Sequence, residues 1–288
     1  MRTRALTVAG LAVLAGAPIL LLLTGHTSIT TSADDEAAAV PLAAIVVPYL
    51  VGLILIRLVP PVLPVLDIAG GDPRAVLSRQ ARWLTVVALL FTVLAVAVRA
   101  AGLKDVYPLL KVLVLLGGGW LVLWRIKGGR RPGRAHRERV PRLWYWLGPV
   151  PAILVWGYLF FYSPLVGGGT DVSGYAGWNR AELAAAAIFS LLTASVLEEW
   201  FYRMMLQTRF EALWGRWPAI VAATLLFVAM HAYRLVEGEV FGTALGLIVS
   251  TGGLGLMAGY LWSRYRNPWA IFVVHGATNA LVLLPLFF

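Results

Sequence analysis

Long apolar stretches recur along this chain, and they constrain its fold more than any other feature. A helix that crosses the hydrocarbon core of a bilayer needs about 20 mostly apolar residues. Nine stretches approach this length, with expected bounds 5–23, 38–59, 83–98, 106–124, 143–162, 181–205, 217–233, 240–263 and 269–287. We therefore predict an all-α, polytopic transmembrane helical bundle of about nine spans, with eight as the alternative.

The composition supports this prediction and excludes several other classes of protein. Of the 288 residues, 60% are hydrophobic and 13% are charged, whereas an ordinary soluble domain has about 25% charged residues. A water-soluble globule and a disordered chain are therefore excluded. Because the chain contains no cysteine, a secreted disulfide scaffold, thiol catalysis and cysteine-ligated metals are excluded as well.

The first apolar stretch has two interpretations. Arg2 and Arg4 precede it, as basic residues precede the apolar region of a signal peptide. The stretch is long for such a region, however, and no clear small-x-small cleavage site follows it. We expect it to be a membrane anchor.

The basic residues indicate how the chain is oriented in the membrane. Lys and Arg concentrate in the cytoplasmic loops of membrane proteins, and most of the 24 Lys and Arg residues share one side if the N-terminus is inside. We therefore predict an N-in, C-out topology. This assignment counts Lys111 with the outer side and Arg203 with the inner side.

The segment 125–142 is strongly basic and divides the chain into two regions. Residues 1–142 are a predicted four-span N-terminal region that ends with this inner loop, and residues 143–288 are a predicted five-span core. The net charge of +10 lies largely in short loops between apolar spans, so we expect the loop to contact anionic lipids and expect no nucleic-acid partner. The oligomeric state stays open.

Two small-residue motifs lie in the 240–263 stretch. Gly242 and Gly246 form one Gly-x-x-x-Gly pair, and Gly255 and Gly259 form another. Such pairs allow two membrane helices to approach closely. We expect packing within the chain, with a dimer contact as the alternative.

The first polar motif within the apolar spans is Glu198-Glu199-x-x-x-Arg203. Its helix is expected to begin after Asn179, with Glu182 three residues later as in a capping box. Glu199 and Arg203 are four residues apart and should form an ion pair on one helix face. Glu198 is left without a nearby cation in the sequence. Charged residues within a membrane span are usually functional, although a helix end with a surface ion pair would also explain the motif.

Two further motifs place histidines in predicted membrane helices. Phe227 and His231 are four residues apart, so the phenyl ring can pack under the imidazole. His275 and Asn279 have the same spacing and can both donate hydrogen bonds towards one point. Each motif taken alone has a structural explanation, namely a buried histidine bound to a neighbouring group or hydrogen bonds between helices.

Taken together, the three motifs predict one site that is assembled from several helices. Glu198 can act as a base, and His231 can help it to hold a water molecule. His275 and Asn279 can donate hydrogen bonds to a developing oxyanion. These are the parts that hydrolysis of an amide bond requires.

The order of the motifs resembles a known family. Glu-Glu-x-x-x-Arg, Phe-x-x-x-His and His-x-x-x-Asn on successive membrane helices are similar to the CPBP intramembrane proteases, also called the CAAX-protease and bacteriocin-processing family or the ABI family. The resemblance covers about residues 143–288 and implies a glutamate-dependent endopeptidase that cleaves a peptide bond in or near the membrane. It assigns Glu198, His231, His275 and Asn279 the roles given above. It further implies that Glu199 and Arg203 orient the site.

The resemblance leaves the need for a metal open. Glu198, His231 and His275 could supply a zinc site with two histidines, one carboxylate and an open position for water. The chain lacks the His-Glu-x-x-His spacing that places two histidines on one helical turn beside a base. We favour a reaction without a metal cofactor, with zinc as the alternative.

Other functions remain alternatives at this point. The same scaffold could be a non-catalytic membrane binder or a bacteriocin-immunity protein. A proton-coupled transporter would require matching polar positions in both halves of the chain, which the front half lacks. The Ala-, Arg- and Gly-rich composition favours a bacterial cell membrane, and we expect a membrane-associated peptide or protein as the substrate, without a prenyl group.

The depths of the motifs expose one difficulty. At about 1.5 Å per residue, Glu198 and His275 lie roughly 10 Å from their inner helix ends, whereas His231 lies roughly 21 Å from Trp217. A single site therefore requires that the 181–205 helix continue towards Trp214, or that the 217–233 helix begin deeper in the membrane.

Overall fold

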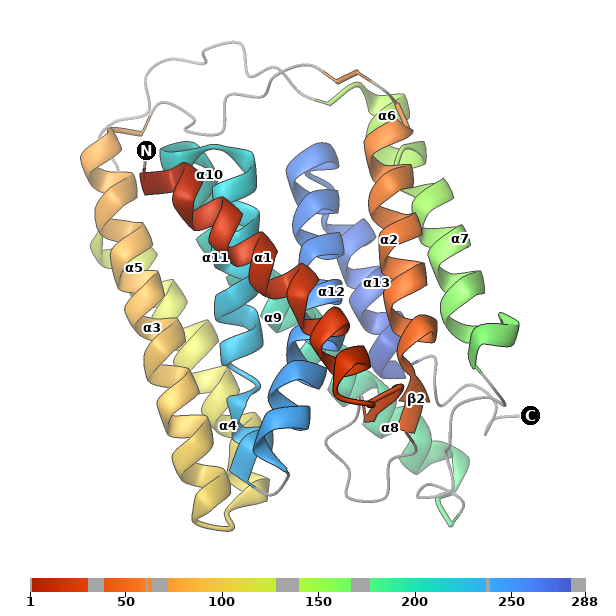
Figure 1. Cartoon of the computed structure of the whole chain (residues 1–288). Helices are drawn as coiled ribbons and strands as arrows, with labels where there is room; N and C mark the ends of the chain where they lie inside the picture. Colours follow the sequence, from red (N-terminus) through yellow and green to blue (C-terminus); the bar gives the residue numbers. More distant parts are fainter. Residues whose placement is uncertain are drawn as a thin grey trace.

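Helices make up most of the chain in the computed structural model, which describes residues 2–30, 39–60, 62–63, 72–127, 140–166, 177–236 and 239–280. The predicted all-α bundle is confirmed (Figure 1). The first helices in chain order are α1 (Arg2–Leu23), α2 (Leu42–Leu58), α3 (Arg74–Ala100), α4 (Tyr107–Lys111), α5 (Gly119–Arg125), α6 (Arg142–Leu147) and α7 (Val150–Phe161). The later ones are α8 (Arg180–Ser190), α9 (Leu197–Glu199), α10 (Thr208–Trp214), α11 (Arg216–Ala229), α12 (Val240–Tyr265) and α13 (Pro268–Ala280).

Short 3-10 and π-helical turns join several of these helices into longer rods. The 3-10 turns are η1 (Lys104–Val106), η3 (Pro164–Val166) and η7 (Ala232–Val236), and the π turns are η2 (Val112–Gly118), η5 (Leu191–Val196) and η6 (Trp200–Gln207). Together with the single helices α1, α3 and α12, these rods give six helices in the described part that are long and apolar enough to cross a membrane. Two shorter apolar helices, α2 and α11, lie among them.

The observed bounds correct several predicted ones. The stretch predicted at 83–98 is part of a longer helix, Arg74–Ala100. The helix predicted at 181–205 continues without a break to Trp214, which resolves the difference in depth between the motifs. The helix predicted at 217–233 ends at Ala229, and the last eight residues of the chain lie outside the described part.

The rod from Arg180 to Trp214 begins as the sequence predicts. The side chain of Asn179 accepts hydrogen bonds from the backbone N–H groups of Ala181 and Glu182, and Glu182 accepts one from the backbone N–H of Asn179. This reciprocal capping box satisfies N–H groups that the first turn leaves free. Farther along, π turns flank the short helix α9, and π turns inside α-helices often occur at functional sites.

The N-terminal helix packs across the later helices. Helix α1 contacts both α11 and α12 (Figure 1), and a side chain on Gly10 would overlap Val221 of α11. The strands β1 (Ser28–Thr30) and β2 (Ala39–Pro41) follow α1 and form a small antiparallel sheet. Helix α2 in turn contacts α7 and α12. The helices of the front region therefore pack against several helices of the later region.

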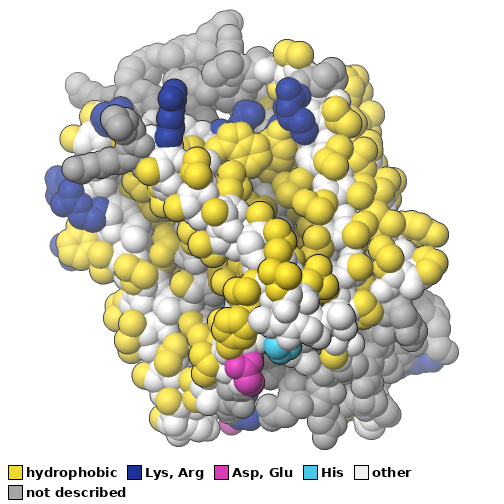
Figure 2. All heavy atoms as spheres, in the orientation of Figure 1, with side chains coloured by type: hydrophobic (Ala, Val, Ile, Leu, Met, Phe, Trp, Pro, Cys, Tyr) yellow, Lys and Arg dark blue, Asp and Glu magenta, His cyan; other side chains and the backbone are white. Residues whose placement is uncertain are grey.

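Arg74 and Arg266, which the N-in topology places on the inner side of the membrane, are both bound near the end of the rod at Trp214, at the upper end of the bundle in Figure 1. Arg74 donates a hydrogen bond to the Leu213 carbonyl, and Arg266 lies 2.7 Å from a carboxylate oxygen of Glu211. Figure 2 shows Lys and Arg side chains near this upper end and hydrophobic side chains over much of the described face below it. The N-in orientation stays a prediction, and most of the basic loop 125–142 lies outside the described residues.

The second glycine pair allows the close helix packing that the sequence predicts. A Cβ on Gly255 would lie 2.8 Å from Cγ2 of Thr224 in α11 and 3.4 Å from Nη2 of Arg203. A Cβ on Gly259 would lie 2.8 Å from Oε1 of Gln207. These contacts are within the chain, so this pair of glycines packs α12 against the helices around the first polar motif.

We predict that Gly255→Ala lowers the stability of the protein. The added methyl group overpacks the contact with Thr224, and overpacking costs about 1–3 kcal/mol. Gly117→Ala is the matched control, because a Cβ on Gly117 meets no atom within 4 Å. Thermal unfolding in detergent should show a lower Tm for Gly255→Ala alone, and an unchanged Tm for this variant would contradict the packing described above.

Candidate active site

The first polar motif lies in the interior of the bundle. Glu198 and Glu199 belong to α9, and Arg203 follows in η6. The exposed fractions of these three residues are 1%, 0% and 0%. An ordinary surface ion pair at a helix end is therefore excluded. Arg203, which the charge count placed on the inner side, lies within the rod because its guanidinium is bound there.

Glu199 and Arg203 form the ion pair that their spacing predicts. Nε of Arg203 lies 3.2 Å from Oε2 of Glu199. The guanidinium also lies over the Phe227 ring, 4.8 Å from the ring centroid. A cation over an aromatic face is attracted by the negative charge of that face, so Phe227 helps to hold the arginine in place.

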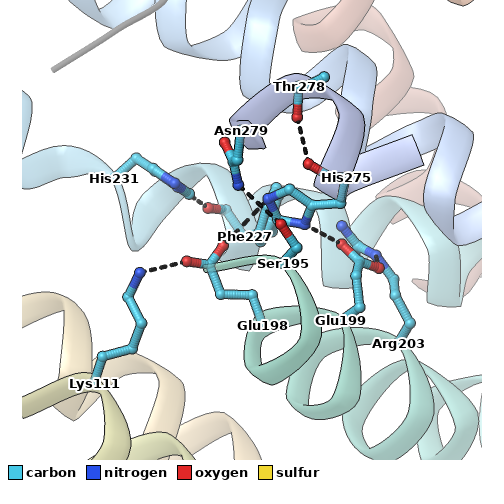
Figure 3. A network of polar contacts seen from close by, with 10 residues as sticks. All are labelled: Lys111, Ser195, Glu198, Glu199, Arg203, Phe227, His231, His275, Thr278 and Asn279. Carbon is cyan, nitrogen blue, oxygen red and sulfur yellow. Dashed lines mark hydrogen bonds and ion pairs between the residues drawn. The ribbon is translucent and has the colours of Figure 1, made fainter. Parts of the chain in front are cut away.

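His275 lies between the two glutamates (Figure 3). Its Nδ1 is 2.9 Å from Oε1 of Glu199, and its Nε2 is 3.9 Å from Oε2 of Glu198. Because an ionised carboxylate can only accept hydrogen bonds, Nδ1 carries the proton. Glu199 therefore orients the ring so that Nε2 faces the Glu198 carboxylate.

His231 is not part of a helix, contrary to the prediction. Helix α11 ends at Ala229, and Nδ1 of His231 lies 2.9 Å from the Phe227 carbonyl oxygen. The imidazole thus satisfies a carbonyl that has no partner in the last turn of the helix. The rings of Phe227 and His231 are in contact, as predicted, with centroids 5.1 Å apart. His231 is near enough to interact electrostatically with Glu198, although no hydrogen bond joins them.

Asn279 does not point to the same atom as His275 in this structure. Its side-chain amide donates to Oγ of Ser195 at 3.1 Å, whereas Nδ1 of His275 donates to Glu199. Ser195 is buried and precedes Glu198 by three residues, which places it on the same helix face. This spacing is a sequence signal that could have drawn attention to Ser195. The roles of His275 and Asn279 as oxyanion donors stay predictions.

Lys111 is the functional candidate that the sequence analysis missed. Its Nζ lies 2.6 Å from Oε1 of Glu198 (Figure 3), and the residue is 6% exposed. The assignment of Lys111 to the outer side is therefore wrong, because the lysine is bound to a carboxylate inside the bundle. The front spans, which showed no polar signature, thus contribute a charged group to the site. A lysine within a predicted apolar span is the signal that could have revealed it.

The zinc alternative requires Glu198, His231 and His275 as ligands. Within the part of the chain that the structure describes, no three His, Cys, Asp or Glu side chains form a group that could hold a metal ion. Oε1 of Glu198 is bound to the Lys111 ammonium, so only Oε2 of this carboxylate is left for another ligand. The donor set does not fit a zinc site.

The part of the chain that contains most of this cluster is similar to a known family. Residues 180–281 match the family model described as type II CAAX prenyl endopeptidase Rce1-like. The predicted resemblance to the CAAX proteases is confirmed. No curated protein and no solved structure matches the chain.

The match contains all three polar motifs and excludes Lys111. Similarity to this family, together with the long apolar helices, indicates an integral multi-pass membrane protein. The division of the chain into residues 1–142 and 143–288 stays a prediction.

We predict that Glu199→Gln strongly destabilises the protein. The change leaves the fully buried Arg203 without its carboxylate, and removal of one partner of a buried pair costs about 3–5 kcal/mol. Glu182→Gln is the matched control, because Glu182 is exposed and glutamine also fits its position in a capping box. Thermal unfolding of the purified variants in detergent measures the effect. Equal Tm values for Glu199→Gln and the wild type would show that the pair does not stabilise the fold.

Proposed function

We propose that the protein is an intramembrane endopeptidase that hydrolyses a peptide bond in a membrane-associated protein or peptide, with Glu198 as the general base. The observation that carries this proposal is the state of the Glu198 carboxylate. Its Oε2 is buried and has no hydrogen-bond partner among the described residues. A buried acceptor without a partner is costly, so this oxygen is suited to bind a water molecule.

The surroundings of Oε2 support the same role. Nε2 of His275 lies 3.9 Å from it, which is too far for a direct hydrogen bond. A water molecule commonly bridges polar groups at such separations. With Nδ1 protonated, a neutral His275 has Nε2 free to accept a hydrogen bond from this water. In His231 the bond to the Phe227 carbonyl uses Nδ1, which leaves Nε2 available.

The proposed reaction uses these groups in two steps. Glu198 removes a proton from the bridging water as the water oxygen bonds to the carbonyl carbon of the substrate. Glu198 passes this proton to Nε2 of the neutral His275, and the oxyanion accepts hydrogen bonds from that Nε2–H and from the second N–H of Asn279. The same proton then moves to the nitrogen of the scissile bond, the carbon–nitrogen bond breaks, and a carboxylic acid and an amine leave.

Glu199 and Arg203 position the reacting groups in this proposal. Glu199 binds both Arg203 and His275, so it fixes the ring whose Nε2 faces Glu198.

Substrates would reach the site from the membrane, since the site is buried among apolar helices. The prenyl group named in the family description belongs to that family, and we expect a substrate without one. A bacterial membrane and binding of anionic lipids to the basic loop remain expectations.

We predict that Glu198→Gln abolishes proteolysis. Glutamine cannot accept the proton of the attacking water, and loss of general-base catalysis typically costs 10²–10⁴-fold in rate. Membranes from cells that produce the wild type, Glu198→Gln or Glu182→Gln are compared by mass spectrometry for new peptide termini. New termini should appear with the wild type and with the exposed control Glu182→Gln, but not with Glu198→Gln.

The same experiment separates a protease from a non-catalytic binding protein. A folded Glu198→Gln variant that yields the same termini as the wild type would overturn the role of Glu198. If no protein yields new termini, the non-catalytic alternative is favoured. A synthetic peptide that spans an identified cleavage site then serves as the substrate for kinetics with purified protein in liposomes.

We predict that chelators leave the cleavage rate unchanged. Oε1 of Glu198 is bound to Lys111, so the carboxylate is neutralised without a metal ion. Purified protein is treated with EDTA or 1,10-phenanthroline, and cleavage of the synthetic peptide is measured before and after. A loss of activity that added zinc restores would contradict this prediction.

A further inference from the structure

Lys111 connects the front spans to the proposed base. It is the last residue of α4, in the rod from Lys104 to Arg125, and it lies outside the segment 180–281 that matches the family model. The hydrogen bond from Nζ to Oε1 of Glu198 spans 87 positions in the sequence. The contact is therefore a product of the tertiary fold.

The aromatic side chains around Lys111 restrict where its ammonium group can lie. Nζ is 4.8 Å from the centroid of the Tyr107 ring. Tyr107 packs on Tyr233, with centroids 4.7 Å apart, and Tyr233 in turn lies 6.2 Å from His231. Cation–π attraction and low exposure thus hold the ammonium beside Glu198.

The two oxygens of Glu198 have different surroundings. Oε1 accepts the hydrogen bond from Lys111, whereas Oε2 has no hydrogen-bond partner among the described residues and faces His275. Binding of one oxygen restricts rotation of the carboxylate and so limits where the other oxygen can lie. The bond from Lys111 thus directs Oε2 towards the imidazole.

A lone carboxylate inside an apolar bundle would be unfavourable as an anion. Buried charges persist where a counter-charge and hydrogen bonds compensate their desolvation. Arg203 provides this for Glu199, at 3.2 Å. Glu198 has no arginine or lysine one helical turn away in the sequence. Its counter-charge is Lys111, whose Nζ lies 2.6 Å from Oε1.

We propose that Lys111 is a positioning residue for catalysis, which keeps Glu198 anionic and aims its Oε2 at the water beside His275. This inference rests on the proposed function of Glu198. It extends the functional site beyond the segment that matches the family model. The span from Lys104 to Arg125 is then required for catalysis, and not only for anchoring the protein in the membrane.

The first test measures the ion pair without any substrate. Tm values in detergent are compared for the wild type, Lys111→Met, Glu198→Gln and the double variant. Each single variant should lower Tm by several degrees, because it leaves one buried charge without its partner. The double variant should lower Tm by less than the sum of the two. Additive changes would show that the two side chains are not coupled, and would overturn the proposal.

The second test measures catalysis with the synthetic peptide that spans an identified cleavage site. Lys111→Met should lower kcat about 10²-fold, as expected when a general base is no longer held in position, with little change in KM. Lys111→Arg keeps the positive charge and should retain more of the activity. Lys104→Met is the matched control, because Lys104 is exposed at the start of the same rod, and it should cleave at the wild-type rate.

The possible results separate this proposal from the proposed function. Wild-type kcat or faster cleavage in folded Lys111→Met would overturn the positioning role, as would equal losses in Lys111→Met and Lys111→Arg. Failure of the wild type to cleave any substrate would instead overturn the proposed function, and the role of Lys111 in catalysis with it. In that case the Tm comparison still decides whether the ion pair exists.

Discussion

The cost of burying ionised side chains in an apolar bundle is the constraint on which this structure depends. Four charged groups meet below the protein surface, and they form two oppositely charged pairs. Glu199 lies beside Arg203 on its own helix, and Glu198 lies beside Lys111 from a distant span. Each pair offsets the desolvation of its members. Four separate helical rods or turns must therefore pack so that these groups and the two histidines face inwards.

Close packing of α12 accompanies this arrangement of charges. Polar side chains recur every four residues after Glu199, at Arg203, Gln207 and Glu211. They face small residues of α12: Gln207 donates to the Gly259 carbonyl at 2.8 Å, and Ser263 donates to Glu211 at 2.6 Å. Small residues let α12 come near enough for its Gly259 carbonyl to accept one of these bonds and for the Ser263 side chain to donate the other. The same row of contacts holds the rod at a fixed rotation, which keeps the glutamates turned towards His275.

Local spacing explains which parts of the structure the sequence could predict. The helical stretches follow from their apolar length, and the capping box at Asn179 follows from the spacing to Glu182. The ion pair of Glu199 with Arg203 follows from a separation of one helical turn. All three depend on residues that are near each other in the chain, so no knowledge of the tertiary fold is needed.

Contacts between distant segments could not be predicted in the same way. The partner of Glu198 is Lys111, and no sequence pattern links two residues that only the packing of α9 against η2 brings together. The apolar pattern does not indicate where α11 ends, so the turn at His231 could not be predicted from it. Asn279 binds Ser195, an interaction between helices whose rotation the sequence leaves undetermined.

Cross-linking between the glutamate rod and α13 is the most direct measurement of the central claim, that distant polar side chains meet at one buried site. The chain has no cysteine, so Ser195→Cys and Asn279→Cys can be combined without a competing thiol. The pair Ile29→Cys and Gly246→Cys is the positive control, because a Cβ at position 246 lies 3.6 Å from that of Ile29, within disulfide range. A short bifunctional methanethiosulfonate should link both pairs within the monomer, in membranes. Linkage of the control pair alone would contradict the convergence on which the proposed site depends.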